Sequence, residues 1–449
     1  MQLILLSGGS GSSLWPLSND SRSKQFLRLL PVGGQSDRCE SMVQRVVRQI
    51  HDAGLHADIT VATAVCQQDG IISQLGDEVG IVTEPTRRDT FPAVCLACEY
   101  LALEKHLSPD EPVIVMPSDP YADAGYFKRI ADMASLLESS SADIILMGVS
   151  PTGPDAGYGY IVPGDSLGRC GAYSVSRFVE NPSVLLAEDL ISHGALWNSG
   201  VYAFRLGYLI EIARRYVDVP TFDGVRDNYA SYPIASFDCE VAAKAPSSVV
   251  LPYDGEWKDL GNWRALTAHL RSNTYGNVTV DSTTSNTHVI NELDIPVMCI
   301  GVSDLVVAAS PDGILISSKD SSEEIKDYAS RLKSRPMYEE RRWGTYKVID
   351  YIDYPDGYSA LTKHLVLRPG ASISYQQHAC RDEVWTFIDG QGEIVLDGER
   401  RPVSRGMTIF IPKGMRHALR ATTPLSFIEV QSGSNLVETD ITRFPFTWD

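Results

Sequence analysis

The chain has 449 residues, 43% of them hydrophobic and 21% charged, and this length predicts two or three domains with ample core. The formal net charge of -18 at pH 7 argues against nucleic acid or an anionic membrane as a partner. No apolar run approaches the roughly 20 residues that a membrane span needs. The eight cysteines are scattered and no leader peptide is evident, so we expect reduced thiols in a cytoplasmic protein.

The first 265 residues or so alternate apolar, strand-like runs with amphipathic, helix-like ones. We expect strands at 59–63, 79–82, 112–116 and 144–149, and helices at 91–106 and 126–138. This alternation predicts a mostly parallel sheet covered by helices. Ligands of such sheets bind at the carboxyl ends of the strands.

A glycine-rich loop, Ser7 to Ser13, follows the first apolar run, Leu3 to Leu6. Glycines let backbone N–H groups close around phosphate oxygens, and we expect a helix after the loop. The spacing matches neither the Walker nor the Rossmann pattern. A tight strand-to-helix turn without a ligand is the alternative interpretation.

Charged residues follow two of the other predicted strands. Arg87 and Arg88 stand at the head of a predicted helix and could hold an anionic or base group, or Asp89 could simply cap that helix. Asp119 ends the strand at 112–116 and could bind Mg²⁺, which prefers few carboxylates plus phosphate oxygens. A turn-forming aspartate before Pro120 is the alternative.

The C-terminal third changes character. Short β-rich runs from about 270 to 325 suggest a small β-helix-like module, and a helical stretch to Leu332 forms the connector. From about 340 the chain reads as all β, with gapped polar residues in two clusters: Gln376, His378, Glu383 and His417. Two imidazoles, a carboxylate and an amide oxygen form a credible divalent metal site with an open position.

Several motifs together resemble a known family. The first group of motifs is Gly-Gly-Ser-Gly at 8–11, Leu-Trp-Pro-Leu at 14–17, Lys-Gln-Phe-Leu at 24–27, Trp-Asn-Ser-Gly at 197–200 and the Asp259 motif at 257–263. This group resembles the sugar-1-phosphate nucleotidylyltransferases, most closely the mannose-1-phosphate guanylyltransferases. Residues 342–344, 381–385 and 428–433 resemble the type II phosphomannose isomerase domain. The resemblance implies an α/β nucleotidyltransferase domain with a Rossmann-like mixed sheet at 1–268, a β-helix-like module and linker at 269–335, and a cupin β-barrel at 336–449.

The resemblance also implies roles for individual residues. Those implied to bind the nucleotide are Leu6, Gly8, Gly9, Ser10, Gly11, Ser12, Ser13, Lys24, Glu84, Arg88, Ser118 and Asp119. Those implied on the sugar side are Tyr158, Gly159, Glu180, Asn198 and Asp238. Asp119 and Asp259 would hold Mg²⁺, with Lys24 beside the phosphates. In the cupin, Gln376, His378, Glu383 and His417 would hold Zn²⁺ or a similar ion, with Arg381 as a catalytic residue.

The implied chemistry is transfer of a nucleotidyl group from GTP to mannose 1-phosphate, with a cupin that interconverts mannose 6-phosphate and fructose 6-phosphate. A nucleoside triphosphate and sugar phosphates are the expected partners, and a homodimer is a family-level expectation. Three departures from the family pattern, Ser13 for arginine, Asn181 for lysine and Val384 for histidine, remove polar groups. They leave open a weakly active or regulatory paralogue, or a transferase with altered specificity. Arg22, Arg87 and Arg88 are candidates to replace the lost cations.

Overall fold

The computed structural model describes residues 1–9, 11–32, 38–168, 170–332 and 334–448. The chain forms two compact units. The first holds residues 1–13, 23–68 and 75–271, and the second holds 14–22, 69–74 and 272–449. Two short stretches of the N-terminal half are therefore integral to the second unit. Across the residues described, no helix has both the length and the apolar character needed to cross a membrane.

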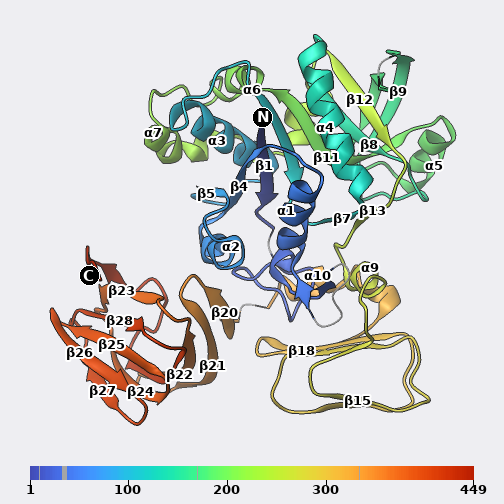
Figure 1. Cartoon of the computed structure of the whole chain (residues 1–449). Coiled ribbons are helices and arrows are strands. Elements are labelled where there is room, and N and C mark those ends of the chain that lie inside the picture. The colour runs from blue at the N-terminus through green and yellow to red at the C-terminus, as the bar shows by residue number, and fades with distance from the viewer. Residues whose placement is uncertain (10, 33–37, 169, 333, 449) are drawn as a thin grey trace. The chain divides into compact units, whose positions relative to one another are not determined.

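A nine-stranded mixed sheet organises the first unit (Figure 1). Its strands in spatial order are β5 (Gly80–Glu84), β4 (Asp58–Ala64), β1 (Gln2–Ser7), β6 (Pro112–Pro117), β11 (Leu196–Arg205), β8 (Ile144–Val149), β12 (Ser248–Tyr253), β10 (Tyr173–Val179) and β9 (Tyr160–Ser166). The first four are mutually parallel, so their carboxyl ends meet at one edge. The strand β11 runs antiparallel to β6 and β8. The strands expected at 59–63, 79–82, 112–116 and 144–149 are confirmed.

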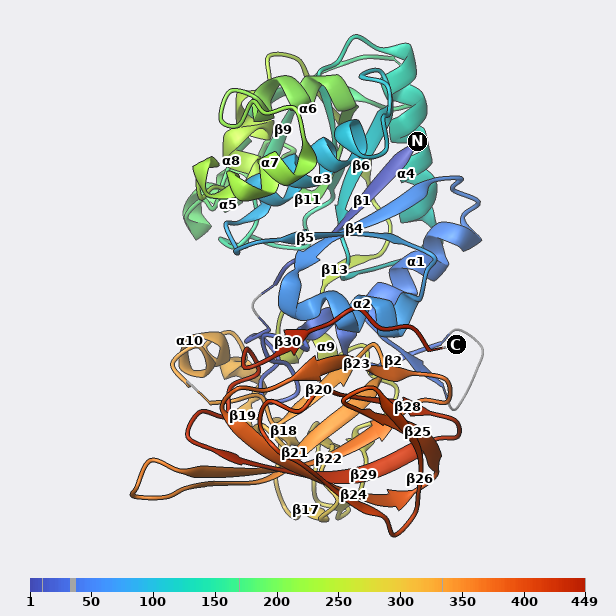
Figure 2. The ribbon, with the colours of Figure 1, turned by 90° about the vertical axis from the view of Figure 1, so that its left-hand side faces the viewer.

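The helices of the first unit accompany this sheet. They are α1 (Met42–Asp52), α3 (Thr90–Leu103), α4 (Ala124–Ser139), α5 (Val184–Ser192), α6 (Leu206–Ala213), α7 (Phe222–Asp227), α8 (Phe237–Glu240) and α9 (Trp263–Thr267). Most of α2 (Gln68–Leu75) belongs to the second unit. Figure 2 shows α3 beside α6, α7 and α8, and α3 packs its apolar residues on Ile4, Val113 and Val115 of the sheet. The predicted helix at 91–106 ends earlier, because His106 adopts a left-handed φ of 52°.

The helix expected directly after the glycine loop is wrong. Residues 14–17 form turns, and the next regular element is a short 3₁₀ helix, Lys24–Phe26. Pro16 has no N–H to donate and disfavours helical dihedrals at Trp15. The Ser18 hydroxyl instead accepts a hydrogen bond from the Leu14 N–H at 3.1 Å. The chain after the loop is thus fixed by turns, within the second unit.

The second unit begins with parallel pairing between short strands. The strands β14 (Thr274–Tyr275), β16 (His288–Asn291) and β18 (Leu305–Ser310) pair in parallel, as do β15 (Val278–Val280) and β17 (Val297–Cys299). Parallel pairing between strands so near in sequence requires the chain to coil, as the β-helix prediction states. The strand β19 (Gly313–Ser318) closes the module, and α10 (Ile325–Ala329) is shorter than the helix predicted to Leu332.

Two facing antiparallel sheets form the rest of the second unit (Figure 2). One contains β20 (Tyr338–Arg341), β21 (Gly344–Asp353), β22 (Ser359–Leu367), β29 (Leu425–Gly433), β24 (Arg381–Asp389) and β27 (Thr408–Ile411). The other contains β26 (Glu399–Ser404), β25 (Gln391–Leu396), β28 (His417–Ala421), β23 (Ser372–Gln377) and β30 (Thr442–Arg443). Alternate residues of β22, β24 and β29 are buried, so every second side chain points between the sheets.

Candidate functional sites

The carboxyl ends of the parallel strands bring three predicted nucleotide-site residues together. The Ser118 N–H donates to the Leu6 carbonyl at 3.1 Å, which joins the ends of β6 and β1. Glu84 ends β5, is buried and accepts a hydrogen bond from the Tyr229 hydroxyl at 2.7 Å. A Cβ at Gly8 would lie 3.0 Å from the Glu84 carboxylate, so the close approach there favours glycine. Burial raises the pKa of Glu84.

The glycine loop is anchored on both sides by side chains. The Gln25 amide donates to the Ser7 carbonyl and hydroxyl at 3.1 and 2.9 Å. The Gln67 amide donates to the Gly9 carbonyl at 2.8 Å, and an Arg87 Nη2 reaches the same oxygen at 3.4 Å. The guanidinium of Arg87 therefore lies at the loop where the sequence predicts phosphate binding.

The other residues of the loop and the other candidate cations are placed differently. Ser10 lies outside the described residues, and Gly11 has a φ of 70°, in the left-handed region. Arg88 donates twice to the Tyr232 carbonyl, at 3.1 and 2.9 Å. Arg22 forms a bidentate ion pair with Glu292 inside the second unit, at 2.8 and 2.9 Å. Of the three arginines proposed as replacements for the one missing at position 13, Arg87 is the one with a hydrogen bond to a described residue of the loop.

Two aspartates that are 140 positions apart meet at Lys24. Their strands, β7 (Pro120–Ala122) and β13 (Trp257–Asp259), pair antiparallel with Asp259 opposite Pro120. The Lys24 ammonium lies 2.9 Å from an Asp119 oxygen and 3.1 Å from an Asp259 oxygen. Burial lowers the pKa of Lys24, but the two carboxylates outweigh it and raise the pKa above its ordinary value. The carboxylates already converge on one cation, which is the arrangement a divalent ion would need.

A cavity of about 240 Å³ lies beside these three side chains, within the first unit. Its lining includes predicted residues of both the nucleotide and sugar sides: Lys24, Asp119, Asp259, Tyr158, Gly159, Glu180, Asn198 and Asp238. Among the lining residues Lys24 is the one basic side chain, against four carboxylates. A sugar phosphate entering this pocket would meet net negative charge unless a divalent ion joins Lys24.

The polar residues deep in the pocket form a hydrogen-bonded group. Asp238 accepts hydrogen bonds from the Asn198 amide and the Tyr202 hydroxyl. In contrast, the buried Oε2 of Glu180 has no hydrogen-bond partner among the described residues. Burial, together with the nearby Asp238 and Asp89 carboxylates, raises the pKa of Glu180 to about 7. A ligand hydroxyl would satisfy this oxygen.

The aromatic side of the pocket is also assembled from remote segments. Tyr158 packs on Trp197 and Trp257, with ring centroids 4.6 and 5.7 Å apart. A Cβ at Gly159 would lie 2.6 Å from Glu180, so only glycine fits there without displacement. Asp89 caps α3, as the alternative interpretation of the arginine motif stated.

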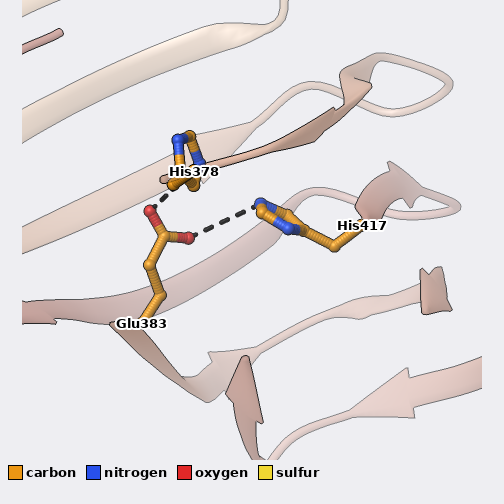
Figure 3. A group of neighbouring side chains, drawn as sticks. All are labelled: His378, Glu383 and His417. Atoms are coloured by element: carbon orange, nitrogen blue, oxygen red, sulfur yellow. Dashed lines mark ion pairs between the residues drawn. The ribbon is translucent and has the colours of Figure 1, made fainter. Parts of the chain in front are cut away.

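The second candidate site lies inside the barrel. His378, Glu383 and His417 are all buried, and one ligand atom from each lies within 4.8 Å of the others (Figure 3). The His378 Nε2 lies 3.3 Å from one Glu383 oxygen, and the His417 Nε2 lies 3.6 Å from the other. Each imidazole Nδ1 contacts a backbone carbonyl, at Asp440 (2.5 Å) and Met415 (3.1 Å). If each Nδ1 carries the hydrogen, each Nε2 lone pair faces the centre.

The chemistry of this donor set fits a divalent ion. The buried Nε2 of His417 has no hydrogen-bond partner among the described residues, which is expected of an atom that ligates a metal. Burial lowers the pKa of His417 to about 4, so the ring is neutral near pH 7. Burial also lowers the pKa of His378, and Arg381 lowers it further. Neutral imidazoles and a carboxylate are suitable ligands for Zn²⁺ and similar ions.

The predicted fourth ligand and the predicted catalytic arginine lie against the same group. Gln376 presents its amide nitrogen to His378 at 3.4 Å, while its oxygen accepts from Ser374, so metal binding would require the amide to turn over. Arg381 donates to Glu383 at 2.9 Å and to the His378 Nε2 at 3.2 Å. Val384, where the family pattern has histidine, lies on the opposite face of β24 from Glu383.

The sequence named Arg87 as one of three candidate cations, but its contact with Gly9 depends on the fold. Sequence reasoning missed two other features of these sites. The closing segment, which we define as residues 434–440 between β29 and β30, supplies Asp440 and Val437, whose carbonyls contact His378 and Arg381. Glu429 lies on β29 beside Glu383, and burial followed by the Glu383 charge raises its pKa to about 7. Inward alternation along β29 was the signal that could have found Glu429.

Three family models match consecutive parts of the chain. Residues 2–274 match the nucleotidyl transferase family, residues 276–332 the mannose-phosphate isomerase/GMP-like β-helix domain, and residues 331–445 the C-terminal domain of mannose-6-phosphate isomerase. The matches follow the same order as the motifs in the sequence.

Curated relatives cover almost the whole chain. The xanthan biosynthesis protein XanB of Xanthomonas campestris is 32% identical, covering 99% of this chain and 98% of its own. A mannose-1-phosphate guanylyltransferase of Salmonella montevideo is 31% identical, covering 98% of each chain. The alginate biosynthesis protein AlgA of Pseudomonas putida is 31% identical, covering 98% of this chain and 95% of its own.

A solved structure agrees with these matches. The protein from Thermus thermophilus described as a mannose-1-phosphate geranyltransferase has a TM-score of 0.60 and 29% identity, covering 74% of this chain and 99% of its own. The mixed sheet, the coiled parallel strands and the barrel correspond to the three matched models. The chain therefore belongs to the nucleotidyl transferase family, among the mannose-1-phosphate guanylyltransferases that carry a C-terminal mannose-6-phosphate isomerase domain.

Proposed function

We propose that the first unit transfers a guanylyl group from GTP to mannose 1-phosphate, giving GDP-mannose and pyrophosphate. The observation that carries the proposal is the meeting of Asp119, Asp259 and Lys24 at one wall of a pocket that also contains the sugar-side residues. Close relatives over the full length are named as guanylyltransferases, so the regulatory paralogue and the transferase of altered specificity are less well supported.

The residues of the pocket would act by positioning and by charge. Asp119 and Asp259 would hold Mg²⁺, which neutralises phosphate charge when bound. Lys24, kept protonated by the two carboxylates, would contact a phosphate oxygen near the reacting phosphorus. Glu180 and Asn198 would orient the hexose through its hydroxyls so that the sugar phosphate oxygen lies in line for attack.

Arg87 is our candidate for the cation that the loop lacks at position 13. Its guanidinium is 3.4 Å from the Gly9 carbonyl and 3.8 Å from the Cys66 sulfur, at the loop itself. A phosphate bound by the loop amides would bring negative charge within reach of this side chain. The nucleotide site would be completed by Leu6, Gly8, Gly11, Ser12, Ser13, Glu84 and Ser118. Arg88 would stabilise the site through its hydrogen bond to the Tyr232 carbonyl.

For the barrel we propose isomerisation between mannose 6-phosphate and fructose 6-phosphate. His378, Glu383 and His417, with Gln376 after its amide turns, would hold a Zn²⁺ or similar ion that polarises the sugar carbonyl. Arg381, which donates hydrogen bonds to Glu383 and His378, would contact the substrate oxygens. The cytoplasmic location and a homodimer remain part of the proposal, the former because both substrates are phosphorylated metabolites made inside cells.

The test is a panel of reactions with purified protein, Mg²⁺, one nucleoside triphosphate at a time and mannose 1-phosphate. We expect pyrophosphate release to be fastest with GTP, with GDP-mannose as the product. The Asp259→Asn variant should lower kcat by about 100-fold or more, because the ion loses one of its two carboxylates. Release of pyrophosphate at equal rates with every triphosphate, or none with any of them, would refute the assigned reaction.

A further inference from the structure

The closing segment, residues 434–440, touches the barrel's candidate metal site at several points. The Asp440 carbonyl contacts the His378 ring, and the Asp440 carboxylate accepts the N–H groups of Ala379 and Cys380 at 3.0 and 3.1 Å. The Val437 carbonyl accepts from Arg381 at 3.1 Å. The segment is thus hydrogen-bonded to residues 378–381, which include the proposed ligand His378.

Glu438 of this segment makes a different kind of contact. Its carboxylate lies 2.6 Å from the Lys363 ammonium and 4.0 Å from an Arg335 nitrogen. Lys363 is 5% exposed, points inward from β22 and lies opposite Glu429 in the strand register. Its ammonium also lies 4.5 Å from the centre of the Tyr346 ring. The ion-pair partner of this buried ammonium is therefore a carboxylate from an exposed segment.

Several cationic side chains surround the Glu438 carboxylate, as they would surround a bound anion. Burial alone would raise the pKa of Glu438, but Lys363, Arg341 and Arg381 outweigh it and lower the pKa to about 2. Lys363 and Arg381 also act on Glu383, so these two cations lie near both a proposed metal ligand and Glu438. Glu438 itself is 44% exposed, whereas Glu383 and Glu429 are buried, so it is the carboxylate that can leave.

We propose that Lys363, with Arg381 and Arg335, forms an anion site in the barrel, and that the Glu438 carboxylate fills it as an internal stand-in until a phosphorylated sugar displaces it. A phosphate monoester offers more oxygens and up to two negative charges in place of one, which suits a site built from several cations. The closing segment would then open when the phosphate enters. This inference rests on the proposed isomerase function for the identity of the sugar, and on the structure alone for the anion site.

The first experiment titrates inorganic phosphate into the full-length protein, followed by calorimetry. Saturating GDP-mannose is present, so that the transferase site is occupied. The Glu438→Gln variant should bind phosphate about tenfold more tightly than wild type, because the competing charge is gone. The Lys363→Met variant should lose this binding. The matched control is Glu399→Gln, an exposed carboxylate paired with Arg401, which should leave the affinity unchanged.

The second experiment needs no substitution. Hydrogen exchange of the amides of residues 434–440 should become faster when phosphate is added to wild type, because the segment leaves its contacts. Slower exchange there, equal affinity of wild type and Glu438→Gln, or retained binding in Lys363→Met would each overturn the inference. Isomerase turnover is measured separately. If the protein has no isomerase activity but Glu438→Gln still binds phosphate more tightly than wild type, only the isomerase function is refuted. If the protein isomerises the sugar but the two affinities are equal, only the anion site is refuted.

Discussion

Lys24 and Arg87 are the basic side chains that we propose for the nucleotide site. Lys24 is held between two carboxylates, and its raised pKa keeps it charged across the physiological range. Arg87 reaches the glycine loop from the start of α3. In the proposed function, these two side chains and a divalent ion would offset the loss of the arginine at position 13 and of the lysine at position 181.

Arg87 is tested by removing its charge. The Arg87→Gln variant should raise KM for GTP about tenfold, which corresponds to losing roughly 1.4 kcal/mol of charge-assisted hydrogen bonding. Adding Ser13→Arg to that variant should restore much of the affinity, because a guanidinium then returns to the loop. The control is Arg226→Gln, an exposed arginine of α7 that lies 3.9 Å from Asp223. Unchanged KM in Arg87→Gln would show that the loop binds without this side chain.

At the scale of elements, local patterns predicted the strands well and the connections less well. The apolar runs of β1, β4, β6 and β8 are buried on both faces, which is why their sequences alone were sufficient. The gapped polar residues of the barrel predicted a metal site, and His378, Glu383 and His417 of that set lie together. The stretch after the glycine loop was misjudged, since its turns depend on Pro16 and Ser18 and on packing within the second unit.

Contacts between remote segments came from the family resemblance and not from local patterns. The resemblance implied that Asp119 and Asp259 meet near Lys24, whereas no local pattern encodes the pairing of β7 and β13 that brings them together. The role of the closing segment depends on where Glu438 lies after the barrel has formed. The motifs predicted which residues carry chemistry, and the fold alone relates them in space.

The hairpin β18–β19 gives a test at this scale. Gly313 has a φ of 152°, and a Cβ there would lie 2.6 Å from the Trp15 ring, within the second unit. The Gly313→Ala variant should lose about 1–3 kcal/mol of stability through overpacking. The matched control is Gly398→Ala, which has a φ of 89° but open space around its Cβ, so it measures backbone strain alone. Equal unfolding midpoints in denaturant for the two variants would contradict the packing argument.

At the scale of the whole molecule, acid should weaken the second unit. Burial, together with the nearby Lys319 charge, lowers the pKa of His288 to about 4. The unfolded chain takes up a proton near pH 6.5, whereas the folded chain does so near 4, so stability falls as the pH drops through this interval. His288→Asn should reduce that loss by about 1–3 kcal/mol. Thermal unfolding at several pH values measures this loss of stability, and the exposed His56→Asn is the control. If stability falls with pH equally in His288→Asn and wild type, His288 is not the group responsible.

In the proposed transferase site, Asp119 and Asp259, remote in sequence, would together hold one divalent ion. The most direct measurement is a Mn²⁺ titration followed by electron paramagnetic resonance, with GDP-mannose bound and the barrel ligand His417 replaced by alanine. The account predicts one tightly bound ion, with affinity at least tenfold weaker in both Asp119→Asn and Asp259→Asn. If Asp259→Asn binds Mn²⁺ as tightly as its parent and makes GDP-mannose at the same rate, the two carboxylates do not share an ion and the account is wrong.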